Sequence, residues 1–316
     1  MTADPTSSTR HAVGRSRKSK SSSETQDSRV AWAFSAPALL LVGAFIVLPF
    51  LLAFVLSFTN QRLISPLPTR FVGIDNYVDA LTSASFWRGF VNNVWFVVVV
   101  VPVQTAFALW LAILVNRKIP GRTFFRTVFF LPVVTVMAAA AVIWTLLFNA
   151  NGLVNAIMEM VTFGQFTPDW LNSTTWALPA VMLVGIWQGV GFQMVILLAA
   201  LQDVPEVLYE AASIDGASRW QQFINVTVPG IRNGLIFVIT VTTILAFRLF
   251  DQVYIMPRVP GGPLDSTRTM MLELVETGFG AQAIGRGAAI AIIFFLIVLA
   301  MTLVQRRFVR EEGEVA

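Results

Sequence analysis

A glutamine in the middle of an apolar stretch shares a helical face with an aromatic ring and two glycines. If residues 175–201 form a helix, Gly185, Gln188, Gly189 and Phe192 lie on one side of it, because positions three, four and seven apart are neighbours. Gln188 could then hydrogen-bond a hydroxyl group, Phe192 could stack on a sugar ring, and the glycines could leave room for a solute. Alternatively, Gly185 and Gly189 form a small-residue patch where two membrane helices pack. The residues alone leave both interpretations open.

Arg248 and Asp251 interrupt another apolar stretch, residues 233–256. A charge near the centre of a membrane helix costs about 2.5–3.5 kcal/mol on insertion scales, so such charges need a partner or a function. The two residues are three positions apart, within reach of an ion pair on one helix. One interpretation is a structural pair near the outer surface. The other is that Arg248 faces a solute pathway and favours an anionic or strongly hydrogen-bonding solute, with Gln104 and Trp144 as weaker candidates beside it.

The composition offers little for catalysis by this chain. It has no Cys and a single His, His11, which excludes a disulfide framework and any metal or catalytic cluster built on these residues. No paired carboxylates of the Asp-x-x-Asp kind occur, as a membrane enzyme would need. No Lys stands in a G-x-x-x-x-G-K-[ST] phosphate-binding loop, so ATP and Mg would be bound by another chain. We expect no catalytic residue, no metal site and no cofactor bound by this chain.

The chain of 316 residues is 56% hydrophobic and only 13% charged, against about 25% charged residues in a typical soluble domain. A helix needs about 20 apolar residues to cross a bilayer. Isolated strands are excluded there because their backbone groups would stay unpaired in lipid. We therefore predict an all-α membrane protein with six transmembrane helices, at residues 33–58, 92–115, 127–148, 175–201, 233–256 and 287–305.

The basic residues predict the direction of these spans. With the N-terminus inside, fifteen Lys and Arg residues fall in inside segments and six in outside segments, which favours an N-in, C-in arrangement. The same distribution explains the net charge of +4 without nucleic acid. We predict a disordered basic cytoplasmic tail at 1–30, the membrane domain at 31–308 and a cytoplasmic C-terminal tail at 309–316. The first apolar run is too long for the core of a signal peptide.

The predicted inside segment between the fourth and fifth spans, residues 203–229, carries turn and capping signals. Asp215-Gly216 is typical of a turn between helices, and Ser218 with Gln221 is typical of a capping box that begins a second helix. The pattern predicts helix, glycine turn, helix, with apolar surface for docking a protein partner. An amphipathic helix lying on lipid is the alternative, but such helices are rich in basic residues, and here Arg219 stands alone among acidic ones.

This segment resembles the cytoplasmic loop of binding-protein-dependent ABC permeases. That loop reads Glu-Ala-Ala, three residues, Gly, nine residues, Ile-x-Leu-Pro. The chain has Glu210-Ala211-Ala212, Gly216 and Val226-Thr227-Val228-Pro229 at the same spacing, with two conservative Val departures. Other segments resemble the maltose-type and glycerol-phosphate-type carbohydrate permeases, and the resemblance covers about residues 30–308; these segments are residues 71–77, 201–202, 209–217, 250–254 and 261–263.

The resemblance implies a type I ABC importer permease fold with cytoplasmic coupling helices, in the inner (plasma) membrane of a bacterium. It implies a heterodimer with a second permease, two ATPase subunits and an extracytoplasmic binding protein that delivers a sugar or sugar-like solute. The coupling residues would be Tyr209, Glu210, Ala211, Ala212, Asp215 and Gly216. The solute path would include the face of Gly185, Gln188, Gly189 and Phe192, and also Thr242, Leu245, Ala246 and Leu249, which are much less polar here than in the maltose-type pattern.

A secondary transporter without an ATPase is the alternative function. It would be expected to have an internal repeat and broken helices that carry coupling charges. No clear repeat is present, and the docking segment at 203–229 would have no role in such a protein.

Overall fold

The computed structural model describes residues 32, 34–64, 68–117 and 120–311, and within these ranges the regular elements are helices, with one isolated bridge between Thr59 and Phe71. The predicted tail at 1–30 and residues 312–316 lie outside the described residues. The elements are η1 Gly43–Val47, α2 Leu48–Leu56, α3 Asp75–Thr82, α4 Ala84–Asn116, α5 Arg122–Val134, α6 Met137–Leu147, α7 Leu153–Thr162, α8 Ala177–Gln202, α9 Glu206–Ile214, α10 Arg219–Gln222, η2 Phe223–Thr227, α11 Val228–Gly230, α12 Arg232–Phe247, α13 Asp251–Ile255, η3 Pro263–Asp265, α14 Met270–Val275, η4 Glu276–Gly280 and α15 Ile284–Glu311.

The contacts divide the chain into two units, Met1–Leu52 and Ala53–Ala316, and each is described by itself. The first predicted span is a helix from Phe34 to Leu56, with a π-helical turn at η1 that continues into α2. The described residues of the first unit are exposed or half-buried throughout. A helix that is apolar on all sides is suited to lipid or to a partner chain.

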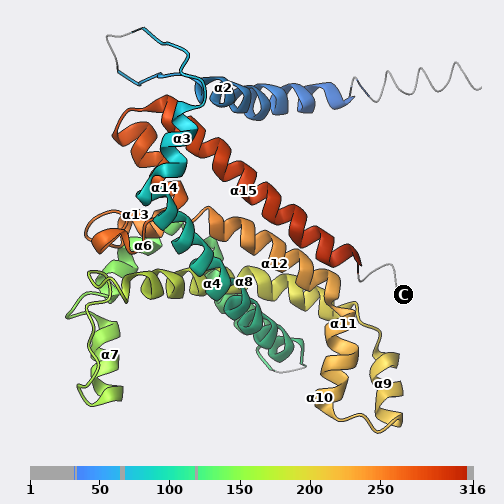
Figure 1. Ribbon diagram of the computed structural model, residues 1–316. Helices are drawn as coiled ribbons and strands as arrows, with labels where there is room; N and C mark the ends of the chain where they lie inside the picture. The colour runs from blue at the N-terminus through green and yellow to red at the C-terminus, as the bar shows by residue number, and fades with distance from the viewer. Residues whose placement is uncertain (1–31, 33, 65–67, 118–119, 312–316) are drawn as a thin grey trace, which may run out of the picture. The chain divides into compact units, whose positions relative to one another are not determined.

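Helices α4 and α8 form the centre of the second unit (Figure 1). Phe96 and Val100 of α4 pack with Val184 of α8 in one buried cluster. Leu111 of α4 packs with Met194 of α8 in another, which α12 completes. Removing apolar side chains from water or lipid contact into such a close-packed interior fixes the distance between helices. The position of the pocket described below therefore depends on this helix pair.

Five described helices are long and apolar enough to cross a membrane, and the bent pair α5–α6 can count as a sixth span. The predicted spans at 33–58, 92–115, 175–201 and 287–305 are confirmed as helices, although α4 begins eight residues earlier than predicted. The predicted span at 233–256 corresponds to the candidate span Arg232–Ile255, which has a short break between α12 and α13, and the predicted span at 127–148 corresponds to the bent pair α5–α6.

The first turns of α4, which precede the predicted start of the span, are stabilised by the residues that lead into α14 and by α14 itself. Asn92 donates hydrogen bonds from its Nδ2 to the carbonyls of Asp265 and Arg268, at 3.0 and 2.9 Å. Arg268 forms ion pairs with Glu273 at 3.1 Å and Glu276 at 2.6 Å, and its Nε also donates to Ser85 of α4. These contacts lie outside the apolar run, so hydrophobicity alone could not indicate them.

The third predicted span is bent by 99° between α5 and α6. Thr135 and Val136 have extended backbone conformations at the bend. Pro132 lies within α5 and has no N–H to donate to the preceding turn. The carbonyl of Pro132 accepts two hydrogen bonds from Thr135, one from its N–H at 3.2 Å and one from its hydroxyl at 2.6 Å. The proline and threonine thus end α5 in the middle of an apolar stretch.

The fifth predicted span is interrupted between α12 and α13, at residues 248–250. Asn93 of α4 donates to the Phe247 carbonyl at 3.2 Å and accepts from the Met270 N–H at 2.9 Å. Thr269 donates from its hydroxyl to the Leu249 carbonyl at 2.9 Å. Irregular backbone within a membrane is stable only where protein groups or a water-lined cavity satisfy it. Here the buried side chains of Asn93 and Thr269 satisfy the backbone carbonyls at the break.

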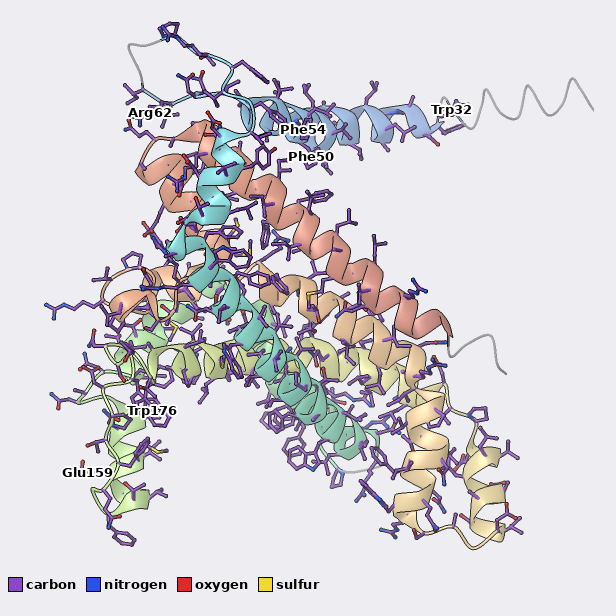
Figure 2. The ribbon with its side chains drawn as sticks, viewed as in Figure 1. Trp32, Phe50, Phe54, Arg62, Glu159 and Trp176 are labelled. Carbon is purple, nitrogen blue, oxygen red and sulfur yellow. The ribbon has the colours of Figure 1, made fainter. Side chains whose placement is uncertain are left out.

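Helix α7 and the chain after it pack against the adjoining ends of α6 and α8 (Figure 2). The rings of Phe148, Phe166, Trp170 and Trp176 form an aromatic cluster, with neighbouring centroids 5.1–5.9 Å apart. Asn155 of α7 accepts a hydrogen bond from the Trp170 Nε1 at 2.7 Å. This attachment fixes a short helix that the apolar runs did not predict.

Candidate functional site

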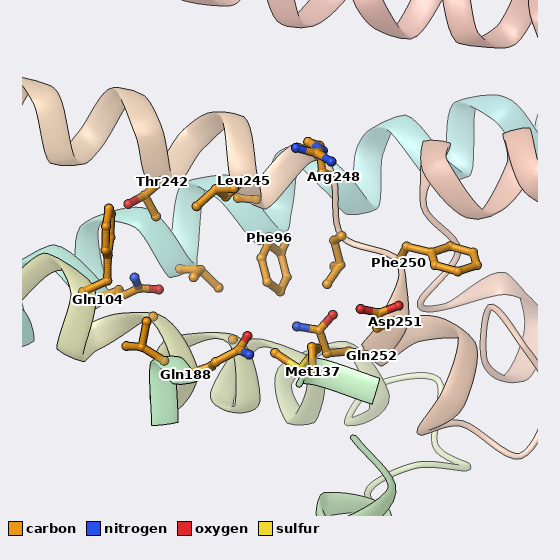
Figure 3. A pocket seen from close by; sticks show the side chains of 17 residues that line it. Phe96, Gln104, Met137, Gln188, Thr242, Leu245, Arg248, Phe250, Asp251 and Gln252 are labelled. Carbon is orange, nitrogen blue, oxygen red and sulfur yellow. The ribbon is translucent and has the colours of Figure 1, made fainter. Parts of the chain in front are cut away.

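One pocket of about 480 Å³ collects residues from α4, α8 and both helix breaks (Figure 3). All nine residues predicted for the solute path line it: Gly185, Gln188, Gly189, Phe192, Thr242, Leu245, Ala246, Arg248 and Leu249. Their convergence confirms that the two predicted faces meet. That these residues bind solute stays a prediction.

The two glycines on α8 accommodate side chains of α4. A Cβ on Gly185 would lie 2.9 Å from the Cζ of Phe96. A Cβ on Gly189 would lie 2.9 Å from the Cδ of Gln104 and closer still to its Nε2. Gly185 and Gly189 are therefore sites of close helix packing, as the small-residue interpretation predicted, and both also line the pocket. The space they leave is occupied by a phenyl ring and an amide.

Amide groups supply the polar surface of the pocket from several elements. Gln188 donates from its Nε2 to the Thr135 carbonyl in the α5–α6 bend, at 3.3 Å, and remains half-buried. Gln104 projects from α4, and Gln252 lies in the first turn of α13. Amides can both donate and accept, so three of them around one cavity suit a ligand that carries several hydroxyl groups.

Thr242 is engaged by the protein itself. Gln193 of α8 donates from its Nε2 to the Thr242 hydroxyl oxygen at 2.6 Å, and both side chains are buried. This bond joins α8 to α12 beside the pocket. The remaining residues of the predicted α12 face differ, since Leu245 is exposed whereas Ala246 and Leu249 are buried. Leu245 and Ala246 lie in the last turn of α12 and Leu249 lies beyond its end, yet all three line the pocket.

Arg248 is exposed at the pocket wall, and of its two interpretations the structure does not form the ion pair with Asp251. Within the described residues, no ion pair of 4.0 Å or less joins the two, although both line the pocket. The cause is backbone geometry: Arg248 ends α12 and Asp251 begins α13, so the spacing of three residues does not run along one helix. Arg248 is thereby left exposed at the edge of the pocket, at the end of α12 (Figure 3).

Several lining residues did not emerge from the sequence: Phe96, Val100, Val133, Met137, Phe250 and Gln252. Gln252 had a usable signal, because it is a polar residue close to the end of an apolar run. The apolar residues had no such signal, because apolar side chains of the same types occur throughout the surrounding helices. Only the packing of α4 and the α5–α6 bend brings them to the pocket.

The segment predicted to couple forms a hairpin, residues 206–230, called the α9–α11 hairpin below. Gly216 has φ +75° and makes the turn after α9, a left-handed conformation that favours glycine. The Ser218–Gln221 capping box is confirmed by reciprocal hydrogen bonds of 2.8 and 3.3 Å. Tyr209 and Thr227 join the two arms through their hydroxyl groups at 3.0 Å. The helix, glycine turn, helix prediction is therefore confirmed.

The tip and one side of this hairpin are exposed. Glu210, Ala211, Asp215 and Gly216 are exposed, whereas Tyr209 and Ala212 are half-buried. Five large apolar residues of the hairpin are also exposed: Val207, Leu208, Ile214, Trp220 and Ile224. Exposed apolar patches of this kind mark interaction surfaces. The hairpin follows the C-terminal end of α8, whereas α7 precedes its N-terminal end, so the two lie at opposite ends of that helix (Figure 1).

A bundle of apolar helices around a polar pocket, with two interrupted spans and an exposed hairpin at one end, defines a multi-pass membrane transport component. Residues 80–312 match the family described as the binding-protein-dependent transport system inner membrane component. The chain belongs to this family. Its role is therefore that of an inner-membrane permease rather than a catalytic enzyme.

Similar proteins agree with this assignment. The chain is 32% identical over 282 residues to the lactose transport system permease protein LacF of Rhizobium radiobacter, covering 89% of this chain and 94% of that protein. It is 33% identical over 274 residues to the probable starch degradation products transport system permease protein AmyD of Thermoanaerobacterium thermosulfurigenes, covering 87% and 91%.

Its fold is similar to that of a chain in a crystal structure of a bacterial alginate ABC transporter, in complex with a periplasmic protein bound to an alginate pentasaccharide. The TM-score is 0.79, the sequence identity is 19%, and the match covers 92% of this chain and 96% of that one. The predicted type I ABC importer permease fold is confirmed. The N-in, C-in direction stays a prediction.

Proposed function

We propose that this chain and a second permease subunit form the translocation path for a sugar or sugar-like solute. An extracytoplasmic binding protein delivers the solute, and two separate ATPase subunits bind ATP and Mg and drive transport. The relatives named for lactose and starch products support a carbohydrate solute. The carrying observation is that all nine residues predicted for the solute path, from two spans, line one pocket.

The chemistry of the pocket supports a polyhydroxylated solute. Sugars present hydroxyl groups around the edge of a ring and C–H groups on its faces. The amides of Gln104, Gln188 and Gln252 can exchange hydrogen bonds with hydroxyls, and Phe192 or Phe96 can pack on a ring face. Arg248 adds five N–H donors. A volume of about 480 Å³ falls within the ordinary range of small-molecule sites, which is about 300–1,000 Å³.

The α9–α11 hairpin supports ATPase docking on the predicted cytoplasmic side. Its exposed residues combine apolar side chains with the carboxylates of Glu210 and Asp215. A cleft lined by apolar and basic groups on a partner would complement this surface. Because α8 and α12 continue directly from the hairpin, a movement of the partner would reach helices that line the pocket.

The test is uptake of a panel of labelled mono- and disaccharides into proteoliposomes that contain the complex purified from native membranes, its binding protein and internal ATP. Glu210→Ala should lower uptake by about tenfold or more and reduce ATPase co-purification, because hydrogen bonds to a charged group contribute about 1.5–3 kcal/mol. Glu159→Ala, an exposed glutamate on α7 at the other end of α8, is the matched control and should retain wild-type uptake.

Uptake that persists without ATP, or without any co-purifying ATPase, would refute the proposal and favour a secondary transporter. Wild-type uptake and ATPase recovery with Glu210→Ala would refute the assignment of the hairpin as the docking surface.

A further inference from the structure

Helix α7 carries an exposed apolar face that the transport proposal does not use. Leu153, Ile157, Met160 and Val161 are all exposed, and Met160 is 80% exposed. Positions four, seven and eight apart lie on one side of a helix, so these four residues form a continuous stripe, called the α7 face below. No packing within the described part of the chain covers it.

The other side of α7 is already attached to the protein. Val154 and Met158 pack on the main apolar cluster, and Asn155 is buried and bonded to Trp170 and to the carbonyls of Ala150 and Pro168. Since α7 cannot roll over to bury the exposed stripe without losing these bonds, the α7 face must meet something outside the described part of the second unit. A stripe of four large apolar side chains in water would be unfavourable by roughly 1.5–3 kcal/mol for each residue.

The position of α7 indicates what covers the α7 face. Gly152 begins the helix, and a Cβ there would lie 2.6 Å from the Leu146 carbonyl oxygen and 2.9 Å from that of Asn149. The start of α7 is thus pressed against the last carbonyls of α6, which form the end of an apolar span. Helix α7 then runs across the direction of α8, near the end at which α8 begins (Figure 1). A helix in this place lies along the membrane surface.

Aromatic residues surround the same site. Trp176 is half-buried and stands where the chain enters α8, in contact with Trp170, which is buried in the cluster that holds α7 (Figure 2). Tryptophans concentrate at the boundary between lipid tails and headgroups. Phe163 ends α7 with φ +53°, and its side chain is 91% exposed, next to the stripe. Glu159 is exposed and, two positions after Ile157, lies off the α7 face, as a residue on the aqueous side would.

We propose that α7 is an interfacial helix whose face of Leu153, Ile157, Met160 and Val161 inserts between lipids at the membrane surface, on the side opposite the α9–α11 hairpin. Insertion relies on apolar burial, because residues 149–174 contain no Lys or Arg to attract anionic lipids. This anchor holds the outer ends of α6 and α8, and hence one rim of the pocket, at a fixed depth. It does not depend on which solute is carried.

The absence of Cys from the chain allows a direct test. Single variants Ile157→Cys and Met160→Cys of the full chain are labelled with a nitroxide in phosphatidylcholine liposomes, and collisions with oxygen and with a water-soluble nickel chelate are measured. Oxygen, which dissolves in lipid, should dominate at both positions. Glu159→Cys on the same helix and Asn172→Cys nearby are matched controls at exposed positions, where the nickel chelate should dominate.

A Met160 label that meets the nickel chelate as freely as the Glu159 label would overturn the proposal, since the face would then lie in water. Shielding of both stripe labels from oxygen and nickel alike would also overturn it and would indicate that another protein covers the face. These readouts need no transport, so they stand apart from the test of the proposed function.

Discussion

The contact of Gly191 with α5 yields the sharpest stability prediction. A Cβ added at Gly191 would lie 2.9 Å from the Cα of Phe130 and 3.0 Å from the carbonyl carbon of Phe129, and closer still to the Phe129 oxygen. Carbon atoms normally approach to about 3.5–4.0 Å. The obstructing atoms are backbone, so α5 must retreat from α8 by on the order of 1 Å in Gly191→Ala.

The expected cost follows from two opposing effects. Overpacking a tight contact costs about 1–3 kcal/mol, and the upper end applies because a backbone cannot rotate away. Replacing Gly by Ala inside a helix returns about 1 kcal/mol. The net loss is therefore about 2 kcal/mol, which corresponds to a fall in melting temperature of roughly 4–8 °C. Because α5 and the bend after it line the pocket, the shift should also disturb Val133 and Met137.

The assay is thermal unfolding of the detergent-solubilised protein, followed by fluorescence-detected size exclusion at a fixed heating time, since such unfolding is usually irreversible. Gly189→Ala is the matched control on the same helix, because its Cβ would meet only the Gln104 amide at the end of a flexible side chain. It should melt within about 2 °C of the wild type, given that propensity and packing nearly offset each other. Equal melting of Gly191→Ala and the wild type would refute the reasoning.

Two further predictions concern the pocket and its support. Asn93→Ala leaves the Phe247 carbonyl and the Met270 N–H without their partner in a buried site, so the same melting assay should report a loss of about 2–4 kcal/mol; an unchanged melting temperature would contradict the role of Asn93 at the helix break. Arg248→Gln removes an exposed group that has no ion pair with Asp251, so stability should stay within about 0.5 kcal/mol while uptake at limiting solute falls about tenfold or more. Wild-type uptake in Arg248→Gln would show that its guanidinium does not contact the solute.

Hydrophobic runs located the spans because each run has about the length that a bilayer crossing requires. They did not show the sharp bend near Pro132, whereas Arg248 marked the interruption between α12 and α13. Each break thus has a local sign, a proline in one case and a charge in the other. What the sequence could not show is that Asn93 and Thr269, far away in the chain, satisfy the backbone freed by a break.

The predicted pocket residues illustrate the same limit. On α8 the helix is regular, so helical spacing correctly placed Gly185 through Phe192 on one face. On α12 the helix ends at Phe247, so helical spacing could not show that Leu249 is buried beyond the helix end or that Arg248 forms no ion pair with Asp251. The α9–α11 hairpin was predictable in detail because its capping box and glycine turn are local signals.

The base of the α9–α11 hairpin has a mechanical consequence. Gly230 lies so close to Val204 that a Cβ there would come within 2.8 Å of the Val204 Cγ2, and the adjoining Ile231 is fully buried. The chain therefore enters and leaves the hairpin through a single packed stem rather than two independent linkers. Above the stem, α8 and α12 are tied by the hydrogen bond between Gln193 and Thr242. A force on the hairpin would consequently act on α8 and α12 at once. The two helices would then tilt together as one rigid unit, and the cavity between them would change shape.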